Sequence, residues 1–247
     1  MHHKDLFHFR QFSMRQAPSG QRVNTDSCAF GALIGPNATP LKILDIGSGT
    51  GVLALMLAVR FPEAMITAVE PELAIAEVAR ANFLASPWSD RINIEVNRAQ
   101  DLDPNVHGTF DFVLCNPPYF QNSLLSDNRL RMVARHNTDL CPDELYESMY
   151  RMMSENGSAW VSFPEDSTSL WVDEGVKAGL HRTHHLIVKD HPGAKPHMTI
   201  VGWTRTKPDE VIEDEVHYRN EHKGRGSEWM RAFRQEWYPE KYNAQFF

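Results

Sequence analysis

The stretch LKILDIGSGTG, residues 41–51, constrains the fold more than any other part of the sequence. A mostly apolar run predicts a buried strand, and glycines follow it at Gly47, Gly49 and Gly51. The next residues, 51–61, carry apolar side chains at helical spacing. A strand that leads through a glycine turn directly into a helix begins a βαβ unit. The stretch therefore predicts an α/β fold with a parallel sheet.

Strand-like runs alternate with helical patterns along most of the chain. Strands are expected at residues 41–47, 64–70, 91–96, 110–115, 158–163, 184–189 and 198–203. Helices are expected at residues 51–61, 73–85, 143–154, 165–178 and 227–238. This order predicts a seven-stranded, mostly parallel sheet with helices on both faces. We expect one domain, with a core at 41–206 and short N- and C-terminal extensions at 1–40 and 207–247.

Composition narrows the class of protein. Cys28, Cys115 and Cys141 lie far apart and form no CxxC pair, which argues against a disulfide framework and a zinc site and favours the reducing cytosol. The twelve histidines show no metal-ligand spacing, so we expect no metal. No run of about 18 apolar residues could span a membrane. A formal net charge of -7 argues against a surface that binds nucleic acid everywhere, but a local basic face remains possible.

The glycine turn has the features of a nucleotide cradle. Its backbone N–H groups can approach a ligand closely, although a glycine turn without a ligand would look the same. Glu70 ends the second strand about 20 residues later, where a carboxylate can accept both ribose hydroxyls of an adenosine cofactor; otherwise it is a surface carboxylate beside Pro71. The spacing DxGxGxG resembles the S-adenosylmethionine loop. Asp45 then holds water or the methionine amino group, or caps the turn. After the third strand, Asp101 is expected to bind the adenine amine.

The fourth strand ends abruptly at NPPY, residues 116–119. Asn116 offers a side-chain carbonyl, and Pro117, which lacks an N–H, can aim its backbone carbonyl at the same planar amine. Pro118 makes the platform rigid, and Tyr119 offers a face for stacking. An ordinary turn would also end a strand at Asn-Pro. At the carboxyl end of a strand beside the glycine turn, however, the motif predicts a pocket for a flat amine or amide.

These two motifs resemble the class I methyltransferases that modify amino groups: adenine N6, guanine N2 and release-factor glutamine methyltransferases. The rest of the chain resembles one of their families, the bacterial tRNA1(Val) adenine N6 methyltransferases. That resemblance covers nearly the whole chain. It rests on FHFRQF (7–12), RVNTDSCAFGALI (22–34), ANFLASPWSDRINI (81–94), ARH (134–136), the pair Pro196-His197 and an aromatic C-terminal helix. The chain departs from the family at Asn24, where a glycine is expected, and at NRAQDL (97–102), whose acid lies further from the third strand.

The resemblance implies a Rossmann-like class I methyltransferase fold and an activity. The protein would transfer a methyl group from S-adenosylmethionine to the N6 amine of an adenine in tRNA, next to the anticodon of valine tRNA. It would be cytoplasmic, with tRNA as its partner. The sequence does not fix the oligomeric state, and we favour a monomer. In the family a Thr-Asp pair, here Thr25 and Asp26, precedes a helix over the cofactor; simple helix capping is the alternative for both residues.

Other residues and functions remain open at this point. Arg129, Arg131, Arg135 and His136 follow the NPPY platform, and either contact RNA phosphates or form a solvated charged face. A protein glutamine N5-methyltransferase acting on release factors would present the same planar amide to the same acceptors. Only about 40 residues precede the first strand, too few for the separate helical domain of such an enzyme. The third possibility is a catalytically silent RNA-binding module.

Overall fold

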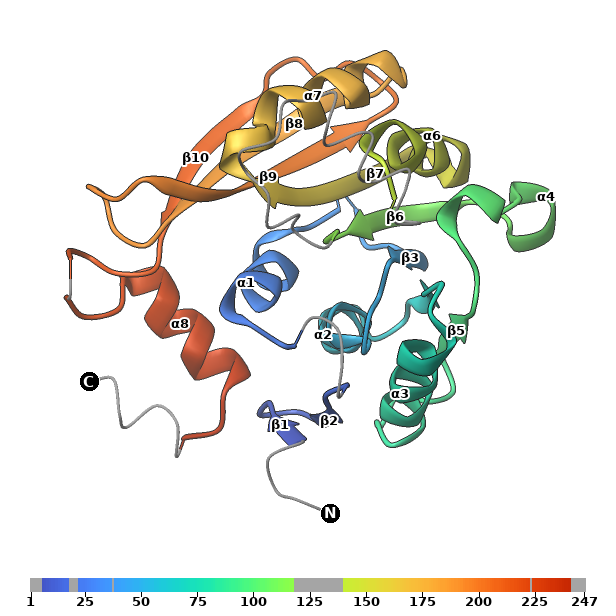
Figure 1. Ribbon diagram of the computed structural model, residues 1–247, viewed down its shortest axis with the longest axis horizontal. Helices are drawn as coiled ribbons and strands as arrows, with labels where there is room; N and C mark the ends of the chain where they lie inside the picture. Colours follow the sequence, from blue (N-terminus) through green and yellow to red (C-terminus); the bar gives the residue numbers. More distant parts are fainter. Residues whose placement is uncertain (1–5, 18–21, 37, 118–139, 223, 241–247) are drawn as a thin grey trace.

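An eight-stranded sheet runs through the molecule, with helices on both of its faces (Figure 1). The structure is a computed structural model that describes residues 6–17, 22–36, 38–117, 140–222 and 224–240. In spatial order the strands are β10 (Ile212–His217), β8 (His181–Lys189), β9 (Pro196–Thr204), β7 (Met153–Pro164), β6 (Phe110–Cys115), β3 (Lys42–Ile46), β4 (Met65–Val69) and β5 (Ile92–Glu95). Only β9 runs antiparallel to its neighbours, so the predicted α/β class and mostly parallel sheet are confirmed.

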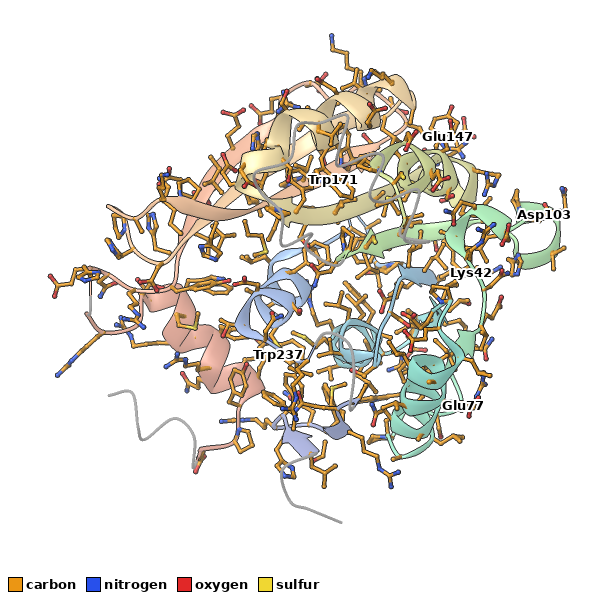
Figure 2. The ribbon with its side chains drawn as sticks, viewed as in Figure 1. Lys42, Glu77, Asp103, Glu147, Trp171 and Trp237 are labelled. Atoms are coloured by element: carbon orange, nitrogen blue, oxygen red, sulfur yellow. The ribbon has the colours of Figure 1, made fainter. Side chains whose placement is uncertain are left out.

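The helices divide between two hydrophobic clusters, one on each face of the sheet. The first face carries α1 (Thr25–Leu33), α2 (Val52–Arg60), α3 (Leu73–Leu84) and α8 (Glu228–Trp237). The second carries α6 (Pro142–Met152), α7 (Thr168–Lys177) and the 3-10 turn Ala99–Asp101, followed by the short α4 (Pro104–His107). Trp171 lies between α7 and the sheet, where its ring stacks on Phe163 at 5.4 Å (Figure 2). Within the described ranges, no helix is long and apolar enough to cross a membrane.

Side chains of β6 alternate between the two clusters, as a fully buried strand requires. Phe112 and Leu114 belong to the cluster beneath α1 and α2, whereas Val113 and Cys115 belong to the cluster beneath α6 and α7. The same alternation continues one residue beyond the strand. It places the side chain of Asn116 on the face that α1 covers.

The sheet contains one strand more than the seven predicted. Ile212–His217, assigned from its sequence to a polar C-terminal extension, forms β10 and pairs in parallel with β8. Only Val216 is buried in this strand, so its sequence lacks the apolar alternation by which the other strands are recognised. Acidic residues at Glu213–Glu215 suit an outermost strand, because charge discourages pairing with another chain.

The two ends of the described chain pack against each other. A hairpin of β1 (Leu6–His8) and β2 (Ser13–Arg15) contacts the last turn of α8, where the Arg10 N–H donates to the Trp237 carbonyl at 2.7 Å. The ring of Phe9 stacks on Tyr238 at 5.9 Å. Trp237 is 1% exposed and lies on the side of α8 that faces the rest of the molecule (Figure 2). The aromatic face of this helix therefore packs on the core.

Candidate active site

Three predicted site residues stand side by side at the carboxyl edge of the sheet. Ile46, the last residue of β3, pairs with Val69 of β4 on one side and with Cys115 of β6 on the other. The residues that follow these three strand ends are Gly47, Glu70 and Asn116. Because neighbouring strands lie about 4.8 Å apart, the glycine loop, the acid and the amide share one edge. This is the edge where open α/β sheets bind their ligands.

The glycine loop is held in a conformation that other residues rarely adopt. Its three glycines have positive φ angles of 67°, 56° and 89° at positions 47, 49 and 51. A Cβ atom at Gly47 or Gly49 would meet nothing within 4 Å, so the space above these two residues is open. A Cβ atom at Gly51 would instead lie 2.3 Å from the ring of Phe83. The first two glycines thus leave room for a ligand, and the third allows close packing of the loop on α3.

Helix α3 also fixes the loop through a buried amide. Asn82 is 2% exposed, and its Nδ2 donates to the carbonyl of Thr50 in the loop at 2.9 Å. The same Nδ2 donates to the Arg15 carbonyl, and Asn82 Oδ1 accepts from the Arg15 N–H. One side chain therefore ties the glycine loop to the N-terminal hairpin.

Glu70 reaches from the end of β4 into the glycine loop. Its Oε2 accepts from the Gly49 N–H at 3.0 Å, and its Oε1 accepts from the Glu72 N–H at 3.1 Å. Burial raises the pKa of Glu70 above its ordinary value, although these two N–H groups act in the opposite direction. A carboxylate has about four acceptor sites, so two bonds leave capacity for hydroxyl groups of a ligand.

Asp45 lies beneath the loop with one oxygen unsatisfied. Its side chain is fully buried, and its Oδ2 accepts from the Ala54 N–H of α2 at 3.1 Å. Its Oδ1 has no hydrogen-bond partner among the described residues, and the same is true of Ser48 Oγ in the loop. A buried polar atom without a partner is rare in native structures. Both atoms are candidates to bind a polar ligand in the cradle.

Burial of Asp45 makes the stability of the protein depend on pH. The pKa of its carboxyl is raised to about 7: desolvation is the main cause, the Ala54 N–H acts in the opposite direction, and the nearby Glu70 carboxylate adds to the increase. In the unfolded chain such a carboxyl titrates near ~3.9. Between these two values the folded protein binds the extra proton. The contribution of Asp45 to the free energy of unfolding therefore decreases as the pH rises through this interval.

We expect Asp45→Asn to remove this decrease, because asparagine can accept the Ala54 N–H without burying a charge. The free energy of unfolding of the variant, relative to that of the wild type, should rise by on the order of 2 kcal/mol between pH 5 and pH 8. Urea denaturation at several pH values measures both curves. A difference that stays constant across this range would mean that the folded protein does not protonate Asp45.

The NPPY platform is described for its first two residues. Asn116 is half-buried and Pro117 is buried. The Nδ2 of Asn116 donates to Ser27 Oγ of α1 at 3.1 Å, and its Oδ1 accepts from Ser162 Oγ of β7 at 2.5 Å. The remaining predicted residues of this region lie outside the described residues: Pro118, Tyr119, Arg129, Arg131, Arg135 and His136.

Thr25 and Asp26 are the first two residues of α1, and neither of them caps it. The capping residue is Asn24, whose Oδ1 accepts from the Ser27 N–H at 2.8 Å, so capping does not account for the predicted Thr-Asp pair. Thr25 is exposed. Asp26 accepts from the Tyr218 hydroxyl at 2.8 Å and contacts His197 Nε2 at 3.3 Å. Burial raises the pKa of Asp26, but these two partners outweigh it and bring the pKa below its ordinary value.

Asp101 pairs with a neighbour on the surface. It ends the 3-10 turn after β5, and its carboxylate accepts from Arg98 Nε at 2.9 Å. This hydrogen bond is the main cause that lowers the pKa of Asp101. The side chain is 51% exposed. Binding of a ligand by this carboxylate would require it to leave Arg98.

Several site residues were not predicted from the sequence. They are buried polar residues, one in the glycine loop and three within helical or apolar segments: Ser48, and Ser27, Asn82 and Ser162. Ser162 had a recognisable signal, because a hydroxyl at the carboxyl end of an apolar strand is costly unless it has a partner. Together with the predicted residues, they form a cradle with free acceptors beside an amide. Such a site can bind a hydroxyl-bearing ligand next to a planar amine.

Comparison with known proteins shows that the chain is similar to methyltransferases. A family model described as methyltransferase small domain matches residues 31–142. The tRNA1(Val) (adenine(37)-N6)-methyltransferase of Bacteroides fragilis is 35% identical over 208 residues, which cover 83% of this chain and 86% of that protein. The protein of the same name from Pedobacter heparinus is 38% identical over 177 residues, or 72% of this chain and 74% of that protein.

Solved structures support the fold. The crystal structure of a predicted O-methyltransferase from Agrobacterium tumefaciens superposes with a TM-score of 0.60 at 17% identity. The match covers 85% of this chain and 95% of that chain. At this identity the likeness shows the fold alone.

Proposed function

The chain belongs to the tRNA1(Val) (adenine(37)-N6)-methyltransferase family, and we propose that it methylates the N6 amine of an adenine in tRNA. It is a methyltransferase with S-adenosylmethionine as its cofactor. The relatives are named for adenine 37 of tRNA1(Val), and we propose the same target for this protein. The observation that carries the proposal is the amide of Asn116, held beside the glycine loop at the edge of the sheet.

The residues of the cradle fit this cofactor. Gly47 and Gly49 have open space where a side chain would stand, and Asp45 Oδ1 is a buried oxygen without a partner among the described residues. We propose that Glu70 accepts the ribose hydroxyls and that Asp45 faces the methionine amino group or its water. Thr25 and Asp26 lie at the start of α1, next to the Ser27 that contacts Asn116, and would close this side of the cradle. When bound, the cofactor supplies an electrophilic methyl group.

Asn116 and Pro117 would act on the amine of the target base. The lone pair of an adenine amine is delocalised into the ring, which makes the nitrogen a poor nucleophile. Acceptors placed against both N–H groups favour a pyramidal nitrogen with its lone pair free. Asn116 Oδ1 and the backbone carbonyl of Pro117 are the proposed acceptors, since proline has no N–H to compete. We propose that Pro118 supports the platform and that Tyr119 provides the stacking face. We also propose that the following side chains contact RNA: Arg129, Arg131, Arg135 and His136.

The predicted role of Asp101 requires its side chain to move. Asp101 would have to release Arg98 to reach the adenine of the cofactor. A tRNA-modifying enzyme would act in the cytoplasm, and we propose separately that this one acts as a monomer. A glutamine methyltransferase is not favoured, because the relatives over most of the chain are named for tRNA.

The proposal is tested by methylation of fractionated cellular RNA and protein with radiolabelled S-adenosylmethionine, followed by nucleoside analysis. We expect label in N6-methyladenosine from the tRNA fraction. Transcribed tRNA1(Val) should accept the label, and the same transcript with guanosine at position 37 should not. Label in protein glutamine, or in no fraction, would refute the proposed substrate.

Glu70→Ala should weaken S-adenosylmethionine binding by about tenfold or more, since each lost charge-assisted bond to a ribose hydroxyl costs roughly 1.5–3 kcal/mol. Isothermal calorimetry measures the dissociation constant. Glu72→Ala is the matched control. Glu72 is exposed, and its substitution removes the same charge two residues away from Glu70. If both variants bind equally well, Glu70 does not contact the cofactor.

A further inference from the structure

The side chain of Asn116 is held at both ends by buried hydroxyl groups from distant parts of the chain. Ser27 belongs to α1 and Ser162 to β7, and the two side chains are 5% and 0% exposed. Ser27 Oγ lies 3.1 Å from Asn116 Nδ2, and Ser162 Oγ lies 2.5 Å from Asn116 Oδ1. Cys115 pairs with Val161, so Ser162 stands directly beside Asn116 across the β6–β7 ladder. Neither serine is needed by the site as described so far.

Asn24, Ser27, Asn116 and Ser162 are linked in series by hydrogen bonds, and one backbone N–H determines the direction of every bond in the series. The Ser27 N–H can only donate, so the Asn24 atom that faces it at 2.8 Å must be the oxygen Oδ1. Ser27 Oγ lies 3.1 Å from the same oxygen and must use its single proton there. The hydroxyl can then only accept from Asn116, which requires the amide nitrogen on that side.

The other end of the amide follows in turn. With its nitrogen directed to Ser27, Asn116 directs Oδ1 to Ser162, whose hydroxyl donates to it. A carbonyl oxygen has two lone pairs, so the bond from Ser162 leaves one of them for another donor. Without the two serines, the Asn116 amide could rotate by 180°, which exchanges Oδ1 and Nδ2 with almost no change in shape. It would then present N–H donors where an amine needs an acceptor.

We propose that Ser27 and Ser162 are positioning residues that fix the Asn116 amide with its carbonyl oxygen available to the target amine. The proposal rests on the proposed function, in which that oxygen accepts an N–H bond from the substrate. In this proposal Asn24 is the first member of the hydrogen-bonded series, because its Oδ1 determines the direction in which the Ser27 hydroxyl donates. The helix cap of α1 and the orientation of the Asn116 amide are thereby one hydrogen-bonded unit.

A purely structural role is the competing explanation, since buried hydroxyls need partners whatever their function. The two roles predict different effects of the serine substitutions on turnover when Asn116 is absent. Positioning residues affect turnover only while the amide that they orient is present. Structural residues affect stability, and any effect on turnover continues after the amide is removed.

The test compares Ser27→Ala and Ser162→Ala in the wild type and in the Asn116→Ala background, with steady-state methylation of tRNA at saturating substrates as the readout. In the wild type we expect each serine variant to lower kcat by ~10-fold, as for loss of orientation of one acceptor. The dissociation constant for S-adenosylmethionine should stay within about twofold of the wild-type value, because the cradle is intact. In the Asn116→Ala background, neither substitution should lower kcat further.

Ser158→Ala is the matched control for Ser162→Ala. Ser158 lies on the same strand and is 3% exposed, and its Oγ has no hydrogen-bond partner among the described residues. Its substitution should leave kcat unchanged. Asn24 provides a test of direction: Asn24→Asp keeps the acceptor for Ser27 and should keep kcat, whereas Asn24→Ala should lower it by a similar factor to Ser27→Ala. The Asn24 pair also replaces Ser27→Ala if that variant does not fold.

Serine variants with wild-type kcat would overturn the proposal, and so would an equal loss of kcat in the Asn116→Ala background. These outcomes are distinct from failure of the proposed function. If tRNA adenine is not the substrate, the wild-type protein itself fails the methylation assay. The serine variants are then compared on the amine that the wild type does methylate, with the same two criteria.

Discussion

Asn116→Ala is expected to lower kcat by on the order of 10²–10³, the usual effect of removing one preorganised hydrogen-bond partner from a transition state. The substitution removes the side-chain acceptor for the target amine but leaves the glycine loop unchanged. Affinity for S-adenosylmethionine should therefore stay near that of the wild type. Steady-state methylation of tRNA at saturating substrates gives kcat, and calorimetry gives the affinity.

The substitution also removes the acceptor of the buried Ser162 hydroxyl and the donor to Ser27 Oγ, which keeps its bond to Asn24 Oδ1. We expect this to cost about 1–3 kcal/mol in stability, so turnover must be measured well below the melting temperature. Asn93→Ala, on the exposed face of β5, is the matched control and should keep full activity. If Asn116→Ala retained most of its turnover, the amide would have no part in the chemistry.

Gly51→Ala is expected to destabilise the fold by about 2–5 kcal/mol, a large part of the stability of an ordinary domain. Two causes add together. A left-handed backbone costs a residue with a Cβ about 1–2 kcal/mol, and overpacking costs about 1–3 kcal/mol. Gly51 has a φ of 89°, and its added Cβ would lie 2.3 Å from the Phe83 ring. Urea denaturation measures the loss directly.

Two comparisons separate these causes. Gly49→Ala has a positive φ but open space, so it should show only the cost of the backbone. In a Phe83→Leu background the colliding ring atoms are absent, and Gly51→Ala should cost less than it does in the wild type. Equal costs in both backgrounds would mean that packing on Phe83 does not select glycine at this position.

Residue patterns were sufficient to predict the elements whose interactions are local. All seven predicted strands are present, because each is an apolar run bounded by polar or glycine residues. The glycine loop and Glu70 were recognisable for a related reason: their roles depend on their place directly after a strand. The register of the sheet then brings Asn116 beside them.

Features that depend on contacts between distant residues could not be predicted in the same way. β10 buries only Val216, so an edge strand and a polar loop have the same pattern there. Ser27 and Asn116 are 89 residues apart, and no spacing rule connects them. Asp101 is a different case, because its partner Arg98 is local: the two side chains stand three residues apart and form an ion pair on the surface.

The contact between the hairpin and α8 has a consequence for the order in which the protein forms. Gln11 donates to the Glu236 carbonyl across 225 residues of sequence. The hairpin therefore cannot make its contacts with α8 until that helix has been synthesised. At 5–20 residues per second, a ribosome needs roughly 10–45 s to make the intervening chain. During that time Phe7 and Phe9 lack the ring of Tyr238, which contacts both of them in the finished fold. The nascent chain therefore exposes an aromatic segment that chaperones can bind, until synthesis of the last helix allows it to be covered.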